Sequence, residues 1–184
     1  VPLGLDVSSP PRLDREAARA RLGLSGKQPF FFTLSRLEEM KGIHLAIDAL
    51  ASLNHPGIQY CIGGEGRMRP VLERMIRERC PRGIRLLGII PREALADWFT
   101  AADLFIFPEI SHPAFGLVSI ESLFHGTPVI ASRSGAIPEI VTPEVGMLFE
   151  RGSSDSLAAG LRGFLPGISE WRSRAACLQR HVIE

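Results

Sequence analysis

The chain has 184 residues, of which 45% are hydrophobic, and its formal net charge is only +1. This balance is typical of an ordinary soluble globular domain and argues against a disordered segment or a nucleic-acid binder driven by bulk charge. The three cysteines are widely spaced, no run of about 18 apolar residues is present, and the start lacks the features of a signal peptide. We therefore expect a cytoplasmic protein without a nucleic-acid partner.

The elements expected along the chain alternate between two kinds. Residues 1–12 are rich in proline, serine and glycine, so we expect a linker that leads into a single domain at 13–184. Short apolar runs predict strands at 30–34, 58–62, 84–87, 104–107, 129–131 and 147–149. Helical spacing or composition predicts helices at 14–24, 42–53, 70–79, 92–101, 116–124, 135–141, 154–164 and 170–182.

Such alternation predicts an α/β fold, namely a Rossmann-like parallel sheet of about six strands with helices on both faces. Sheets of this kind bind ligands beyond the carboxyl ends of their strands, near the point where the strand order reverses. Candidate site residues are therefore expected directly after the strands.

Two cations and a glycine-rich turn follow the first two strands. Arg36 comes just after strand 30–34, and Lys41 is expected to open the next helix, so both could hold one anion above the sheet. The alternative is that both pair at the surface with Glu38 and Glu39. Gly64, in the turn after strand 58–62, either lets a ligand approach the backbone or serves a tight turn.

The helix at 116–124 opens on a glycine and carries one carboxylate in an apolar sequence. Free amides of Gly116, Leu117 and Val118, with the positive end of the helix dipole, suit an anion such as a diphosphate. Glu121 lies one turn further, where it could accept hydrogen bonds from a hydroxyl pair such as a ribose. The alternative is a Glu121 that pairs with an arginine. Together these features indicate a nucleotide site.

Metal chemistry has little support in the sequence. The histidines are scattered, with no HExxH pattern, and no Asp-x-Asp is present that could hold a metal nucleotide. His125, in the last turn of helix 116–124, is interpreted as structural, stabilising the terminal carbonyls when it is protonated. We expect no metal site.

Seven segments in order, from about Phe32 to Leu165, resemble the C-terminal, donor-binding domain of retaining GT-B glycosyltransferases (glycosyl transferases group 1, or family 4). They are Ser35-Arg36-Leu37 with Lys41-Gly42, Gly63-Gly64-Glu65-Gly66, 84–88, 101–108, Phe115-Gly116-Leu117-Val118 with Glu121, 126–131 and 135–141.

The resemblance implies that the ligand is a nucleoside-diphosphate-sugar, with UDP, GDP or ADP as the nucleotide. Arg36 and Lys41 would act on the diphosphate as the catalytic cations, and Glu121 would hold the ribose. The amides of Gly116, Leu117 and Val118 would complete the cradle, and the base would lie near Gly64 and Leu87. The family usually works without a bound metal, and no permanent cofactor is expected.

Two departures from the family pattern stand out. Position 113 is a proline where the family carries a glutamate that contacts the donor sugar, so Glu109 or His112 substitutes, the donor differs, or catalysis is weakened. The N-terminal acceptor domain is also absent, and residues 1–12 resemble the end of the linker that leaves it. We expect the full-length enzyme to be a hexosyltransferase and this chain alone to be inactive. Peripheral association with a membrane through the missing half is compatible with the sequence.

Two other functions are compatible with the same sequence. One is a GT-B relative that binds a nucleotide without transferring a sugar, either an epimerase or a degenerate domain. The other is an interaction module with no nucleotide, in which Arg36, Lys41 and Glu121 would not meet at one cleft.

Overall fold

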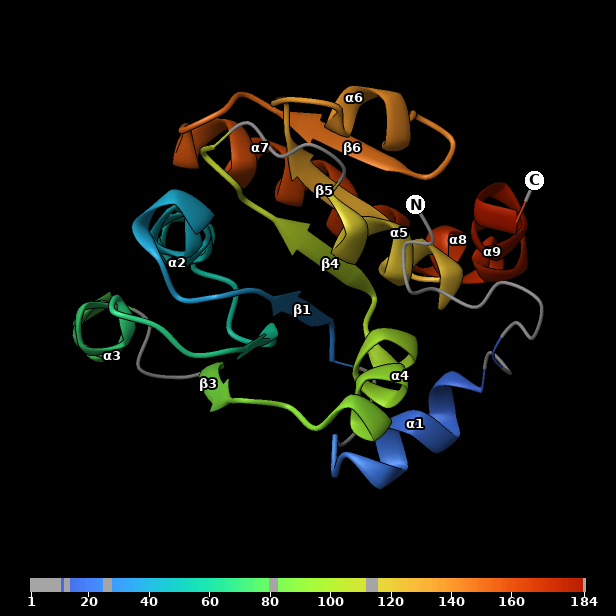
Figure 1. The fold of residues 1–184 in the computed structure, drawn as a ribbon, viewed down its shortest axis with the longest axis horizontal. Helices are drawn as coiled ribbons and strands as arrows, with labels where there is room; N and C mark the ends of the chain where they lie inside the picture. Colours follow the sequence, from blue (N-terminus) through green and yellow to red (C-terminus); the bar gives the residue numbers. More distant parts are fainter. Residues whose placement is uncertain (1–10, 12–13, 25–27, 80–82, 112–115, 184) are drawn as a thin grey trace.

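The chain forms one central sheet between two layers of helices (Figure 1). The computed structural model describes residues 11, 14–24, 28–79, 83–111 and 116–183. The strands are β1 (Phe30–Leu34), β2 (Gln59–Gly63), β3 (Ile84–Gly88), β4 (Leu104–Phe107), β5 (Val129–Ser132) and β6 (Gly146–Phe149). The α-helices are α1 (Arg15–Arg21), α2 (Ile43–Leu53), α3 (Arg69–Arg79), α4 (Arg92–Ala101), α5 (Leu117–Phe124), α6 (Ile137–Ile140), α7 (Ser154–Phe164), α8 (Ile168–Ser173) and α9 (Ala175–Ile183).

The six strands are all parallel and lie in the order β3-β2-β1-β4-β5-β6. This confirms the predicted α/β fold with a parallel sheet. The order runs outward from β1 on one side and from β4 on the other, so β1 and β4 flank the point at which the direction of winding reverses. That point is where doubly wound sheets bind their ligands.

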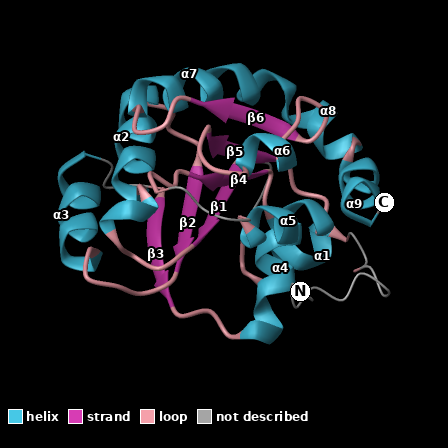
Figure 2. Ribbon diagram, turned by 45° about the horizontal axis from the view of Figure 1, so that its top comes forward, coloured by secondary structure: helices cyan, strands magenta, loops and turns pink. Residues whose placement is uncertain are grey.

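Successive residues of a strand point to opposite faces of the sheet. Because consecutive residues such as Phe30, Phe31 and Phe32 are apolar and buried, both faces of the sheet are apolar. Phe31 packs in a cluster with side chains of α2 and α7, whereas Phe30 and Phe32 pack in a second cluster with α4 and α5. Figure 2 shows the strands between α2, α3 and α7 on one side and α4, α5 and α1 on the other. Each face thus has its own core. The strands β1, β4 and β5 are buried along almost their whole length, whereas β3 at one edge of the sheet carries the exposed Arg85.

The predicted helix at 170–182 is wrong, because the chain forms two helices that meet at Arg174. Ile168 on α8 is buried in the cluster that contains Phe31. Leu178 on α9 is buried in the cluster on the opposite face of the sheet. Trp171, also on α8, packs against both clusters, so the two short helices lie where the clusters meet.

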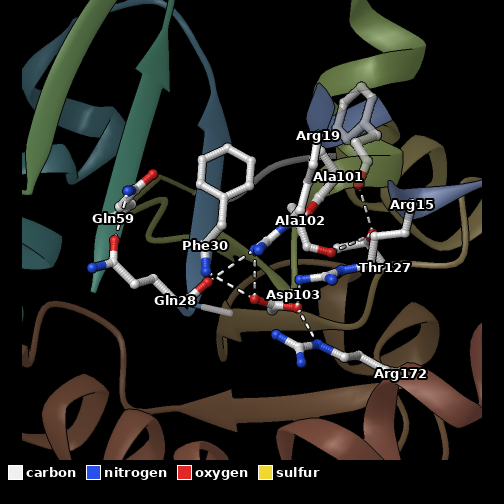
Figure 3. Close-up of polar contacts among 11 residues, drawn as sticks. Arg15, Arg19, Gln28, Phe30, Gln59, Ala101, Ala102, Asp103, Thr127 and Arg172 are labelled. Atoms are coloured by element: carbon white, nitrogen blue, oxygen red, sulfur yellow. Dashed lines mark hydrogen bonds and ion pairs between the residues drawn. The ribbon is translucent and has the colours of Figure 1, made fainter. Parts of the chain in front are cut away.

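A buried carboxylate, Asp103, ties the two ends of the domain to the amino ends of β1 and β4 (Figure 3). Its Oδ2 accepts a hydrogen bond from the Phe30 amide at 2.8 Å, and its Oδ1 accepts one from Arg172 Nε on α8 at 2.6 Å. Arg15 and Arg19 on α1 also form ion pairs with it. Burial lowers the pKa of Arg15 to about 10. The cluster lies at the edge of the sheet opposite the expected ligand site.

Helix α5 ends in a glycine-dependent turn. His125 is the C-cap, Gly126 follows at φ 73°, and the amides of Gly126 and Thr127 donate to the carbonyls of Leu123 and Ser122. The expected role of a protonated His125 is wrong. Burial lowers the pKa of His125 to about 4, and its ring stacks on Phe99. At neutral pH the ring is therefore uncharged; it packs on Phe99, and its Nδ1 lies 3.3 Å from the hydroxyl oxygen of Thr100.

His125 makes a testable contribution to the pH dependence of stability. The folded-state pKa of His125 lies below the usual 6.5, so folding favours the neutral ring. The stability that comes from burying this neutral ring is fully present above pH 6.5 and is lost as the pH falls through about 4. The loss should be on the order of 3 kcal/mol, at roughly 1.4 kcal/mol per pKa unit. In urea unfolding at several pH values, His125→Gln should remove most of this slope, and His55→Gln, at an exposed position, should leave it intact. An unchanged slope in His125→Gln would contradict this assignment.

Candidate nucleotide site

The candidate site lies at the carboxyl ends of β1 and β4. After β1 the chain crosses the sheet edge through Ser35 and Arg36, and a short 3-10 helix, Glu39–Lys41, precedes α2. Lys41 therefore ends this turn and does not open α2, which corrects the expectation from the sequence. Helix propensity does not predict this 3-10 helix. The segment after β4 contacts it, since the amide of Ile110 donates to the carbonyl of Met40.

Gly42 fixes the position of Lys41. It has φ 66°, and a Cβ atom at this position would lie 1.9 Å from the carbonyl oxygen of Pro108 at the end of β4. The amide of Ile110 donates to the carbonyl of Met40 at 2.8 Å. The turn after β1 and the segment after β4 are thus in direct backbone contact, which only glycine at position 42 allows.

Two neighbouring hollows share Arg36, Lys41 and Glu109. One, of about 320 Å³, is completed by side chains and backbone of β1, β4 and the start of α5: Leu34, Ser35, Phe107, Gly116, Leu117 and Val118. The other, of about 550 Å³, is completed by Glu38, Glu39, Met40, Arg67 and Ser111. We call the first hollow the cradle and the second the outer hollow.

The cradle brings together five of the eight residues predicted for the site: Arg36, Lys41, Gly116, Leu117 and Val118. Gly116 is the N-cap of α5 in a left-handed conformation, φ 55°, and it lines the cradle together with the first two residues of the helix, Leu117 and Val118. Amides of a first helical turn have no acceptor within the helix, so they are available to an anion. The surface pairing expected as the alternative for Lys41 is not what the structure shows, because its partner is Glu109.

Lys41 and Glu109 form a tight ion pair within this wall. Lys41 Nζ lies 2.8 Å from Oε1 and 2.6 Å from Oε2 of Glu109. The Glu109 side chain is only 4% exposed and that of Lys41 is 26% exposed. Sequence reasoning named Glu109 only as a substitute for the missing sugar-contacting glutamate. The position of Glu109, two residues after the apolar strand β4, was the feature of the sequence that could have indicated a role in the site.

Glu121 is half-buried on α5 and lines neither hollow. Burial raises the pKa of Glu121, and the charge of Arg92 only partly opposes that shift. Within the described part of the chain, its carboxylate has no ion pair or hydrogen bond. The alternative of a Glu121 paired with an arginine is therefore not realised, and a half-buried carboxylate remains available to a hydroxyl donor.

Gly64 and Leu87 lie at the ends of β2 and β3 and line neither of these hollows. Gly64 has φ 125°, and a Cβ atom there would lie 1.8 Å from the carbonyl oxygen of Ser35. This close backbone crossing accounts for the glycine without a ligand, which is the structural alternative stated for this turn. Pro113, His112 and Phe115 lie outside the described residues, as does the expected linker apart from residue 11.

The residues that the structure describes offer neither a metal site nor a helix that could span a membrane. No group of three or more His, Cys, Asp or Glu side chains there could hold a metal ion. No helix in that part of the chain combines the length and apolar character needed to cross a bilayer.

The fold and site define a class: a doubly wound α/β domain with cations and a helix N-terminus converging at its switch point, the arrangement of a nucleotide-binding domain. Residues 14–174 match the family model described as glycosyl transferases group 1. The chain belongs to this family, and its fold matches that of GT-B glycosyltransferases.

Several characterised proteins are similar to the chain. A GDP-mannose-dependent monoacylated alpha-(1-6)-phosphatidylinositol monomannoside mannosyltransferase of Corynebacterium glutamicum is 31% identical over 170 residues, which cover 86% of this chain and 44% of the relative. Sucrose-phosphate synthase of Thermosynechococcus elongatus superposes with a TM-score of 0.83 at 29% identity, over 91% of this chain and 43% of that one. HepE of Anabaena in complex with UDP-glucose superposes with a TM-score of 0.83 at 25% identity, over 97% and 50%.

The chain thus spans about half the length, or less, of these relatives.

Proposed function

We propose that this chain is the donor-binding part of a retaining hexosyltransferase whose donor is a UDP-, GDP- or ADP-sugar. The observation that carries the proposal is the convergence of Arg36, Lys41 and the first turn of α5 on one cradle at the switch point. Family membership and the UDP-glucose complex of HepE support a nucleotide-sugar ligand. The acceptor would be held by an N-terminal half, as the greater length of the relatives supports.

The cradle residues would divide the chemistry of donor activation. Arg36 and Lys41 would bind the diphosphate as fork and point charge, and the amides of Gly116, Leu117 and Val118 would add the positive end of the helix dipole. As the bond to the sugar breaks, negative charge grows on the departing diphosphate, and these fixed positive groups would stabilise it. Glu121 would accept hydrogen bonds from the ribose, and the base would lie near Gly64 and Leu87. Without its acceptor half, the chain would bind the donor but not transfer the sugar.

Calorimetric titration of the chain with UDP, GDP and ADP tests the proposal. We expect at least one of the three to bind with a heat that saturates at one nucleotide per chain. No binding of any of them at millimolar concentration would overturn it and would favour an interaction module.

A change at Glu121 should move affinity and stability in opposite directions. Glu121→Gln should weaken nucleotide binding roughly tenfold, or about 1.5 kcal/mol, because a charged acceptor is lost. Because the folded-state pKa of Glu121 is raised, folding favours the protonated carboxyl. The stability from this carboxyl is fully present below its usual pKa of 4.5 and is lost as the pH rises through the folded-state pKa. The variant should therefore unfold at higher urea than the parent at pH 7 and show no such gain at pH 4.

The matched control for Glu121→Gln is Glu139→Gln, the same change at an exposed position on α6. It should alter neither affinity nor stability. Equal nucleotide affinity in Glu121→Gln and the parent would contradict the ribose role, whereas lower stability at pH 7 would contradict the electrostatic cost of burying this carboxylate.

A second candidate function rests on Pro113, which replaces the family's sugar-contacting glutamate. It is a GT-B relative that binds the nucleotide-sugar without transferring it, as an epimerase or a degenerate domain. Assays of the full-length protein with radiolabelled donors separate the candidates: sugar appears on an acceptor, as an epimer, as free sugar, or only in the unchanged donor.

A further inference from the structure

The Lys41–Glu109 pair places a negative group inside a cradle built for an anion. Glu109 lines both the cradle and the outer hollow, yet its carboxylate is almost completely buried. Both of its oxygens lie within 2.8 Å of Lys41 Nζ, and Ser111 Oγ donates a further hydrogen bond to Oε1. These contacts leave it poorly placed to receive a sugar hydroxyl, the role for which the sequence had made it a candidate.

The backbone on both sides holds this pair in place. The Ser132 hydroxyl on β5 donates to the carbonyl of Glu109, and the Met40 carbonyl accepts from the amide of Ile110. Gly42 packs directly against Pro108, the residue before Glu109. Lys41 and Glu109 therefore face each other because of the chain path, and the pair is a built feature of the site and not one rotamer of a mobile surface lysine.

The charges that line the cradle indicate what the pair does. Arg36 is not in a salt bridge within the described residues, and Glu38 is near enough for the charge of Arg36 to help lower its pKa. Lys41 is neutralised by Glu109, and the two together add no net charge. A diphosphate that approaches Lys41 meets the Glu109 carboxylate beside it, and like charges at such range oppose binding.

We propose that Glu109 is a built-in counter-ion that competes with the donor diphosphate for Lys41. The inference rests on the proposed function, because it takes the diphosphate as the ligand of Lys41. Without a diphosphate, Glu109 holds the ammonium group of Lys41. In the loaded site, the diphosphate draws Lys41 away from Glu109, which keeps the hydrogen bond from Ser111. The competition lowers the affinity for the diphosphate and so favours release of the spent nucleoside diphosphate.

Calorimetry with Glu109→Gln tests this competition. The amide keeps the shape of the side chain and removes its charge, so we expect the nucleoside diphosphate to bind at least about tenfold more tightly than to the parent. The corresponding uncharged nucleoside should bind both proteins equally. Glu38→Gln is the matched control, since Glu38 lines the outer hollow but pairs with the exposed Arg67, and it should change affinity little.

The outcomes separate this inference from the proposed function. If the parent binds a nucleoside diphosphate and Glu109→Gln binds it equally or more weakly, Glu109 does not compete for Lys41 and the inference alone fails. An equal gain in Glu38→Gln would also overturn it, because any lost negative charge would then suffice. If neither the parent nor Glu109→Gln binds any nucleoside diphosphate, the proposed function itself fails. Thermal unfolding checks that the variant is folded, and Glu109→Ala provides a second charge removal if it is not.

Discussion

Replacing Asp103 with alanine should lower the free energy of unfolding by about 3–5 kcal/mol, the range for breaking a buried ion pair. Its side chain is fully buried and is the shared partner of Arg15, Arg19 and Arg172. Without it, three neighbouring guanidinium groups would lack their common counter-ion, and the Phe30 amide would lose its acceptor. For a domain stabilised by roughly 5–15 kcal/mol, this is a large fraction of the total. Urea unfolding at pH 7 measures it.

Two controls make the Asp103 prediction specific. Asp97→Ala removes a carboxylate whose partner, Arg21, is 58% exposed, and it should cost no more than about 1 kcal/mol. Nucleotide affinity of folded Asp103→Ala should match that of the parent, because the cluster lies at the opposite edge of the sheet from the cradle. A stability loss similar to that of Asp97→Ala would show that the arginines find other partners.

Local sequence patterns sufficed for most of the fold. The apolar runs at 30–34 and 104–107 and the helical spacing at 92–101 and 154–164 match the observed elements residue for residue. Buried parallel strands and amphipathic helices have strong local signatures, since one pattern decides what each element buries. The break at Arg174 has no such signature, because it depends on which face of the sheet each helix packs against.

Local sequence patterns could not predict the long-range polar contacts, for a similar reason. Arg15 and Arg172 are separated from Asp103 by 88 and 69 positions, and no local periodicity links them. The same holds for Lys41 and Glu109, which are 68 positions apart. The sequence placed Arg36, Lys41 and the start of α5 at one edge of the sheet, because parallel strands all end there. The sequence could not show that the ammonium group of Lys41 forms an ion pair with the carboxylate of Glu109.

Lys41→Ala should produce the largest functional effect, a loss of nucleoside diphosphate affinity of at least about 100-fold, or roughly 2.7 kcal/mol. Two causes add: a hydrogen bond between charged groups is lost, and Glu109 then faces the diphosphate with no ammonium between them. Stability should also fall by about 3 kcal/mol, the lower end of the range for a buried pair, because Lys41 keeps some contact with solvent. Calorimetry and urea unfolding measure the two effects on the same protein.

The double variant Lys41→Ala with Glu109→Gln separates the two causes. Removing the stranded carboxylate should restore most of the lost stability, because the buried site is then neutral, but only part of the affinity, because the cation is still missing. Arg67→Ala is the matched control: it removes a cation of the outer hollow that is 89% exposed, so both quantities should change little. Full recovery of affinity in the double variant would mean that Lys41 serves only to neutralise Glu109, and that Arg36 and the first turn of α5 bind the diphosphate without it.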